Sequence, residues 1–180
     1  MPENSLESWQ GRALVVGGGG IGRALHAELS QRHPSLEVTL ATRHPLSIKE
    51  WPLDLESPES LATLTERLRA DSHPLRLVFN ATGRLHGPSF QPEKRLQHVE
   101  QAALIDAFAI NAAGPLLLAK SIEPALSRHS PFHYASLSAR VGSIGDNRSG
   151  GWYAYRSAKA AQNMMLRCLS LEWARRLPLA

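Results

Sequence analysis

The sequence predicts a doubly wound α/β fold, in which helices cover both faces of a parallel β-sheet. Short apolar runs alternate along the chain with longer segments whose apolar residues recur at helical spacing. A run of four glycines separates the first apolar run from the first helical segment. Alternation of this kind is typical of parallel strands joined by covering helices. The chain has 180 residues, enough for a substantial core, and we expect a single domain over residues 1–180.

Each expected element follows from its local pattern. An apolar run at residues 13–16 predicts the first strand, and the helix that leaves the glycines is expected over residues 21–32. Further strands are expected at residues 36–41, near Leu53, at 75–80 and at 132–136, and further helices at 58–70, from after Gln91 to about 127, and from about 152 to 177. Residues 84–92 and 142–151 contain glycine or proline and are expected to be loops beyond strand ends. Because ligands of open α/β sheets bind there, both loops are candidate walls of a site.

The glycine run indicates a nucleotide site. Gly17, Gly19 and Gly22 fit the pattern G-x-G-x-x-G, and Ile21 lies within the same turn. In this pattern glycine permits a tight turn, close approach of a pyrophosphate to the backbone, and packing of helix on strand. The amide groups at the start of the helix then hold the anion. Four consecutive glycines also suit a flexible loop, but a strand before them and a helix after them favour the nucleotide interpretation.

The end of the second expected strand favours NADP over NAD. A protein that binds NAD usually has Asp or Glu there, about 20 residues after the glycines, to bind the ribose 2′-hydroxyl. This sequence has Leu40-Ala41-Thr42-Arg43-His44 instead, without a carboxylate. The guanidinium of Arg43 can pair with a 2′-phosphate, assisted by Arg23, Thr42 and His44. The alternative is that Arg43 is an ordinary surface loop residue. The missing acid also argues against a methyltransferase that uses S-adenosylmethionine.

Tyr155 and Lys159 form a second informative motif. Their spacing of four places both side chains on one face of a helix. A cation beside a phenol favours the phenolate, so we expect Lys159 to lower the pKa of Tyr155 from its ordinary value of about 10 and to let it exchange protons near neutral pH. By itself the spacing also arises by chance.

Composition excludes several other classes. The net charge of +4 is spread along the chain and does not predict a nucleic-acid surface. His129 and His133 are close in sequence, but Pro131 lies between them, and no metal site is expected. We see no apolar run that indicates a membrane span, nor a secretory start, and the single cysteine, Cys168, is expected to be a buried thiol in a cytoplasmic protein.

Taken with these motifs, further segments show that the chain resembles the short-chain dehydrogenase/reductase family. Asp54-Leu55 is similar to the family's Asp-apolar pair beside the adenine, and Asn80-Ala81-Thr82-Gly83 to its Asn-Ala-x-Gly segment. Asn111 resembles the asparagine of the catalytic tetrad, and Ser138 the catalytic serine. The stretch 138–161 resembles a branch that contains cell-contact signalling factors and carbonyl-reductase-like members.

The resemblance implies a Rossmann-like fold and hydride transfer between the nicotinamide of NADP and a carbonyl or alcohol substrate. It implies that Tyr155 is the general acid or base, that Lys159 holds the nicotinamide ribose, and that Ser138 binds the substrate oxygen. Ser138 taken alone is better explained as a strand-end hydroxyl that caps a turn. The family often pairs subunits through two long helices, so we expect a homodimer or homotetramer, although these apolar helix faces also suit covering a sheet.

Pro115 suggests a local feature of the Asn111 helix. A proline has no N–H to donate to the carbonyl group four residues earlier, which here is that of Asn111. We expect the freed carbonyl to hold a water of the family's proton relay. The alternative is a kink that only fits the helix to the sheet.

Three features depart from the family pattern. The glycine turn is one residue shorter than its commonest form, and seventeen positions separate Ser138 from Tyr155. The chain also ends where relatives continue with two more strands and a substrate-covering loop, so we expect the last strands of the family fold to be missing and the fifth strand to be a sheet edge. The chain is then either a fragment of a longer protein or a non-catalytic nucleotide-binding or signalling protein on the same fold.

Overall fold

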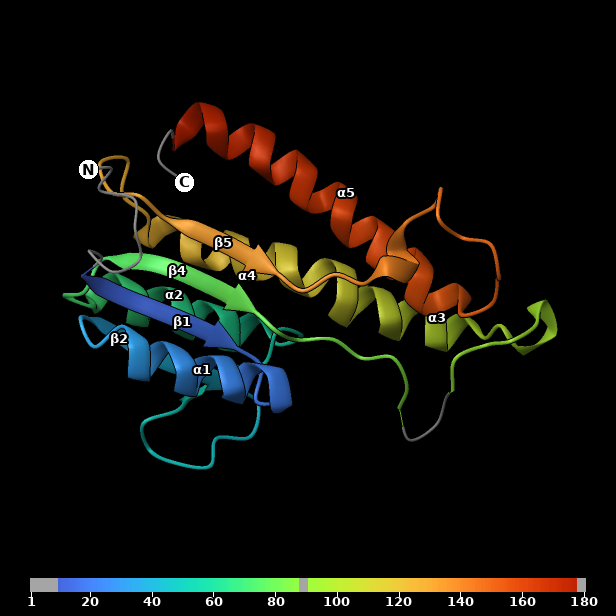
Figure 1. The fold of residues 1–180 in the computed structure, drawn as a ribbon, viewed down its shortest axis with the longest axis horizontal. Helices are drawn as coiled ribbons and strands as arrows, with labels where there is room; N and C mark the ends of the chain where they lie inside the picture. The colour runs from blue at the N-terminus through green and yellow to red at the C-terminus, as the bar shows by residue number, and fades with distance from the viewer. Residues whose placement is uncertain (1–9, 88–90, 178–180) are drawn as a thin grey trace.

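A parallel five-stranded sheet forms the centre of the molecule, with the strand order β3-β2-β1-β4-β5 (Figure 1). The computed structural model describes residues 10–87 and 91–177. The strands are β1 Gly11–Val16, β2 Leu36–Thr42, β3 Trp51–Pro52, β4 Leu75–Asn80 and β5 His133–Ser136. Each lies where the sequence predicts a strand. Among the described residues β5 has one neighbour in the sheet, β4, and is therefore the expected edge.

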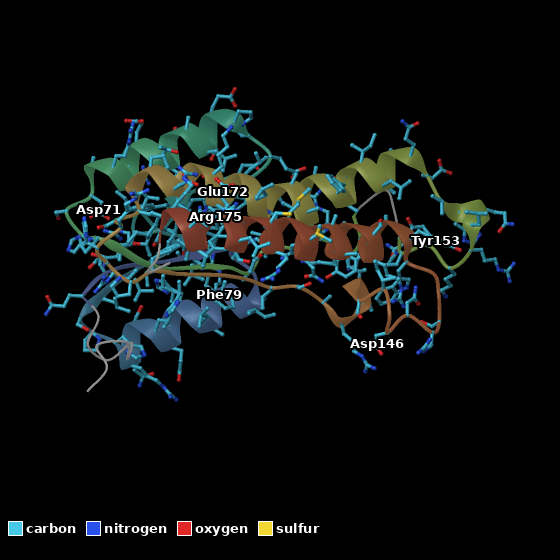
Figure 2. All side chains as sticks on the ribbon, turned by 90° about the horizontal axis from the view of Figure 1, so that it is seen from above. Asp71, Phe79, Asp146, Tyr153, Glu172 and Arg175 are labelled. Carbon is cyan, nitrogen blue, oxygen red and sulfur yellow. The ribbon has the colours of Figure 1, made fainter. Side chains whose placement is uncertain are left out.

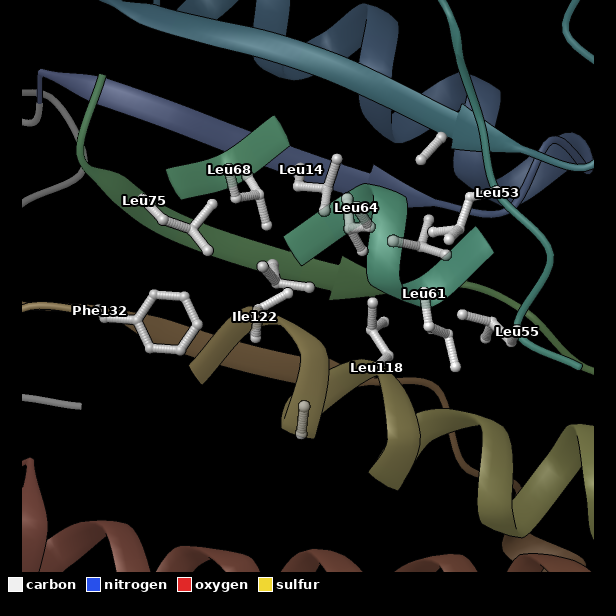
Figure 3. Close-up of a cluster of buried hydrophobic side chains, with 14 of the residues drawn as sticks. Leu14, Leu53, Leu55, Leu61, Leu64, Leu68, Leu75, Leu118, Ile122 and Phe132 are labelled. Carbon is white, nitrogen blue, oxygen red and sulfur yellow. The ribbon is translucent and has the colours of Figure 1, made fainter. Parts of the chain in front are cut away.

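Helices cover both faces of this sheet, as the doubly wound fold requires. They are α1 Gly20–Arg32, α2 Pro58–Ala70, α3 Gln101–Phe108, α4 Gly114–Ile122 and α5 Tyr153–Arg176. Leu29 of α1 packs with Ala13, Val15 and Leu40 on one face. On the other face α2 and α4 enclose the larger core, which includes Leu61, Leu64, Leu68, Leu118 and Ile122 (Figure 3). Within α2, Leu61, Leu64 and Leu68 recur at helical spacing and form a buried leucine stripe.

The predicted bounds of α2 match at both ends for local reasons. Ser57 precedes the helix, and its hydroxyl accepts a hydrogen bond from the Ser60 N–H at 3.1 Å. Pro58 occupies the first helical position, where the missing N–H costs no hydrogen bond. Arg67 and Arg69 lie in the last turn, where positive charge interacts favourably with the helix dipole.

The helical region predicted from after Gln91 begins later, at Gln101, and ends at Ala125. Before it, only the 3₁₀ turn Leu96–His98 is helical. The prediction was wrong here because Glu93 makes long-range contacts with the start of α5, where its backbone carbonyl accepts from the N–H of Trp152. The region is also not one regular helix, because the π-helical turn Ala109–Ala113 separates α3 from α4.

Two expectations about apolar residues need correction. Cys168 is exposed, because it lies outside the arc of α5 that buries Ala158, Gln162 and Trp173. The helical stretch Gln101–Ala125, in which we saw no membrane signal, is long and apolar enough to cross a membrane. Half of its tested window is buried inside the fold, and a core helix passes the same test.

An ion pair at the end of α2 predicts acid sensitivity. Burial by itself would raise the pKa of Asp71, but hydrogen bonds from Arg12 and His73 outweigh it and lower the pKa to about 2. Because the pKa is lowered on folding, the stabilisation is present above about pH 4 and is lost as the pH falls toward 2. We expect Asp71→Asn to lower the free energy of unfolding by about 2 kcal/mol at pH 7 and by much less at pH 2.5. Urea titrations of both proteins at both pH values measure this, and an equal loss at the two pH values contradicts it.

Candidate active site

The glycine turn between β1 and α1 is compact and constrained. Gly17 has φ of 117°, a conformation that side chains rarely adopt. A Cβ atom at Gly22 would lie 1.9 Å from the carbonyl oxygen of Gly17, so the first turn of α1 closes onto the glycine turn itself. At Gly19 a Cβ atom would meet nothing within 4 Å, which leaves open space beside this backbone. Ile21, at the second position of α1, is 62% exposed.

A cavity of about 450 Å³ opens beside this turn, at the carboxyl ends of the strands. Most of the residues predicted to bind the cofactor line it: Gly17, Gly19, Thr42, Arg43, Asp54, Leu55, Ala81 and Gly83. Asn80 lies beneath, fully buried, and its amide donates to the Ser136 hydroxyl at 3.0 Å. Segments that follow β1, β2, β3 and β4 therefore meet at one cavity whose size suits a small-molecule ligand.

Arginines line the side of the cavity formed by β2 and α1. Arg23 and Arg43 both reach it, together with Thr42 and His44. Glu50, from the loop before β3, bonds Arg23 at 2.8 Å, and this hydrogen bond lowers the pKa of Glu50. Arg43 lies 3.7 Å from Glu56. Sequence reasoning missed Glu50, because no pattern links a residue in this loop to Arg23.

Lys159 is almost fully buried beneath the strand ends. Its ammonium donates to the Leu137 carbonyl at 2.9 Å and to Oε1 of Gln162 at 2.8 Å. It lies 5.8 Å from the centroid of the Tyr155 ring. Burial lowers the pKa of Lys159 to about 8, because an ammonium group loses hydration there. Gln162, one helical turn further on, is a site residue that the sequence did not reveal.

The expected lowering of the Tyr155 pKa is wrong for this structure. Burial raises the pKa of Tyr155. The predicted pair does share a helix face, but the ammonium lies over the ring and donates to Leu137 and Gln162. The phenol therefore loses water without gaining a hydrogen bond from the cation. The spacing of four residues correctly predicted that Tyr155 and Lys159 lie close together, but it did not predict that burial removes water from the phenol.

Asn111 joins the loop after β4 to the Lys159 region. Its side chain accepts from the Arg84 N–H at 2.9 Å and donates to the Arg84 carbonyl at 2.8 Å. A Cβ atom on Gly83 would lie 3.3 Å from Oδ1 of Asn111 and 3.7 Å from Nζ of Lys159. The three residues thus meet, and glycine leaves the room for them.

Helix geometry around Asn111 is irregular, as expected from Pro115. Asn111 lies inside the π turn, and the N–H of Gly114 donates to the carbonyl of Ala109, five residues earlier. The carbonyl of Pro115 accepts from the Tyr134 hydroxyl at 2.6 Å. The water expected at the Asn111 carbonyl remains a prediction.

Ser136, the last residue of β5, and Ser138, two residues beyond it, have different surroundings. The Ser138 hydroxyl donates to Asn163 at 2.7 Å. Asn163 lies eight residues beyond Tyr155 in α5, about 12 Å along the helix axis. Ser136, in contrast, accepts from Asn80 and from Gln162 at 2.9 Å, so it belongs to the buried network around Lys159. We expected the Ser138 hydroxyl to be catalytic, but in this structure it is hydrogen-bonded to Asn163.

A glycine turn on a parallel sheet and a Tyr–Lys pair on the long last helix occur together in this fold. The family model for short chain dehydrogenases matches residues 12–177, which is nearly the whole chain. The chain belongs to the short-chain dehydrogenase family. The family resemblance noted from the sequence is therefore confirmed. Among the described residues no group of three His, Cys, Asp or Glu side chains is placed to hold a metal ion.

Three proteins similar to this chain illustrate the relationship. The C-signal protein of Myxococcus xanthus is 39% identical over 77 residues, 43% of this chain. The 1-hydroxy-2-glutathionyl-2-methyl-3-butene dehydrogenase of Rhodococcus sp. (strain AD45) is 31% identical over 119 residues, 63% of this chain. The match covers 46% of each of these two relatives, so the chain aligns with about half of their length. The NADPH-bound carbonyl reductase from chicken fatty liver has the same fold, with a TM-score of 0.75 at 22% identity over 94% of this chain and 77% of that one.

Proposed function

We propose that this protein is an NADP-dependent oxidoreductase that transfers a hydride between the nicotinamide and a carbonyl or alcohol carbon. The observation that carries the proposal is the buried ammonium of Lys159, held over the Tyr155 ring and next to Gly83 of the cavity. The glycine turn fits a dinucleotide, because it leaves open space at Gly19 beside the start of a 13-residue helix. When bound, the nicotinamide supplies or accepts the hydride at its C4 atom.

Tyr155 is suited to act as the acid of a reduction. Its raised pKa keeps the phenol protonated at neutral pH, so the O–H can donate to a carbonyl oxygen as negative charge develops there. The ammonium of Lys159 stabilises the phenolate that remains. In the proposed site Asn111 fixes the backbone of Arg84 at the cavity wall, and Ser138 binds the substrate oxygen after release from Asn163.

The preference for NADP is supported by Arg23 and Arg43 at the β2 side of the cavity. A 2′-phosphate there would meet two guanidinium groups, sharing Arg23 with Glu50 and Arg43 with Glu56. Titration of the protein with NADPH and with NADH tests this preference. Consumption of NADPH with a panel of ketones and aldehydes tests the reaction.

The pH dependence of the reaction should report the protonation of Lys159. Since its pKa is lowered to about 8, the ammonium is present below that pH and is lost above it. We expect the rate of reduction to fall as the pH rises above about 8. Gln162→Leu removes an acceptor that favours the charged form, so it should move this fall to lower pH. Profiles of kcat from pH 6 to 10 measure both, and the same midpoint in both proteins contradicts the assignment.

A second candidate is a nucleotide-binding or signalling protein without turnover. The similarity to C-signal and the bond of Ser138 to Asn163 favour it. NADPH binding without consumption on any substrate in the panel would support this candidate.

A homodimer or homotetramer is proposed from the outer surface of the long helices. Ile105 and Phe108 of α3 and Met164 and Leu171 of α5 are 43–65% exposed. Large exposed apolar patches mark protein contact surfaces. Light scattering after size exclusion gives the mass, and a monomer at all concentrations contradicts the proposal.

A further inference from the structure

A second cavity lies at the start of α5, apart from the nucleotide cavity. Its volume is about 430 Å³, and it shares no lining residue with the first. Its walls come from the loop after β5, the segment before α3 and the first turn of α5: Lys94, Val141, Ser149, Gly150, Gly151, Trp152 and Arg156. Figure 2 shows this end of the molecule, where Tyr153 and Asp146 are labelled.

The charged residues that line this cavity are both cations. The guanidinium of Arg156 donates to the Val141 carbonyl at 3.3 Å and to the Ser149 hydroxyl at 3.0 Å, and both acceptors are neutral. Its Nε atom is buried without a partner in the part of the chain that the structure describes. Within that part, neither Arg156 nor Lys94 forms an ion pair. The cavity therefore has positive charge that no described carboxylate neutralises.

The nearest acids in the sequence have other partners. Glu93 is 4% exposed, and its carboxylate accepts from the N–H of Ala154 at 3.3 Å and 3.4 Å. Asp146 pairs with Arg140. The positive charge of Arg156 is therefore left for an anion that enters the cavity.

The backbone of the cavity wall is held in an uncommon conformation. Gly150, Gly151 and Trp152 have φ values of 62°, 66° and 53°, three left-handed residues in succession. For a residue with a side chain this costs roughly 1–2 kcal/mol, and such strain persists only where surrounding contacts enforce it. Here the N–H of Trp152 donates to the carbonyl of Glu93, next to Lys94. Trp152 lines the cavity together with the two cations.

We propose that this cavity binds an organic anion, a carboxylate or phosphate attached to an apolar group, and that Arg156 is its main ligand. A guanidinium offers paired N–H donors that match the two oxygens of such an anion, and the present acceptors of Arg156, on Val141 and Ser149, are neutral. Arg156 directly follows Tyr155 in α5, so the guanidinium and the proposed catalytic phenol leave the helix from consecutive positions, about 100° apart around its axis. The anion has two candidate sources. One is the acidic end of the carbonyl substrate, an assignment that rests on the proposed function. The other is a separate molecule in the same cavity.

A matched pair of substrates tests the first source. We expect the wild type to reduce 4-carboxybenzaldehyde with a lower KM than its methyl ester. Arg156→Gln should raise KM for the acid at least tenfold and leave KM for the ester and for NADPH within about twofold, and Arg156→Lys should restore part of the loss. Arg148→Gln, a nearby exposed arginine that does not line the cavity, is the matched control and should change neither. Equal effects of Arg156→Gln on acid and ester overturn this source.

Direct binding makes the test independent of turnover. Titration of the NADPH-loaded protein with 4-carboxybenzoate and with phosphate, followed by calorimetry or NMR, should show binding in the wild type that Arg156→Gln abolishes. Binding without discrimination between acid and ester substrates identifies a separate anion. Failure of both anions to bind a folded wild type that still binds NADPH overturns the proposal and leaves the proposed function intact.

Discussion

Replacing Tyr155 by phenylalanine is expected to lower the rate of NADPH-dependent reduction by roughly 10²- to 10⁴-fold, the share that a positioned general acid contributes. The substitution removes one oxygen atom and keeps the ring, so the contact of Lys159 with the ring persists. Affinity for NADPH should therefore change by less than about threefold. Single-turnover rates and fluorescence titration of the coenzyme separate the two effects.

Tyr153→Phe is the matched control, because Tyr153 begins the same helix and its side chain is 40% exposed. It should retain nearly full activity. If Tyr155→Phe reduces substrates at the wild-type rate, another group delivers the proton and the proposed mechanism fails. If both variants and the wild type bind NADPH without turnover, the second candidate function is supported.

Gly22→Ala is expected to weaken NADPH binding at least 100-fold and to destabilise the fold. The added Cβ atom would lie 1.9 Å from the carbonyl oxygen of Gly17, and that atom belongs to rigid backbone. Either the glycine turn moves out of its binding shape or the start of α1 unwinds. Coenzyme titration and thermal unfolding measure the two outcomes.

Gly20→Ala provides the comparison, because a Cβ atom there would meet nothing within 4 Å. Gly20 begins α1, where alanine is the better helix former, so stability should be unchanged or slightly higher. A Gly22→Ala protein that binds NADPH as the wild type does would show that the turn adapts and would remove the steric argument.

The elements that the sequence predicts well are those whose causes lie within a few residues. Ser57, Pro58 and the leucine stripe determine α2 locally, and both of its ends were predicted. The prediction of a helix directly after Gln91 was wrong because Glu93 forms hydrogen bonds at the start of α5, about 60 residues away. No pattern in the neighbouring sequence predicts such a long-range contact.

The candidate site shows the same division. Motif spacing predicted that Gly17, Thr42 and Gly83 would line one cavity, since strand ends converge in any parallel sheet. It did not predict that Gln162 accepts from Lys159 or that Glu50 pairs with Arg23. It also gave the wrong direction for the pKa of Tyr155, because burial depends on the whole packed structure.

The π turn Ala109–Ala113 changes the direction in which side chains point between α3 and α4, which follow one another along a single helical segment. In a regular helix Ala107 and Leu118, eleven residues apart, would point within about 20° of each other. One extra residue in the turn rotates everything beyond it by about 100°. Ala107 can thus pack with Ala154 and Ala158 of α5, while Leu118 joins the leucines of α2. One continuous helical segment can thereby pack against α5 with one face and against α2 with another. Deleting one residue from Ala109–Ala113 would turn Leu118 away from its present neighbours.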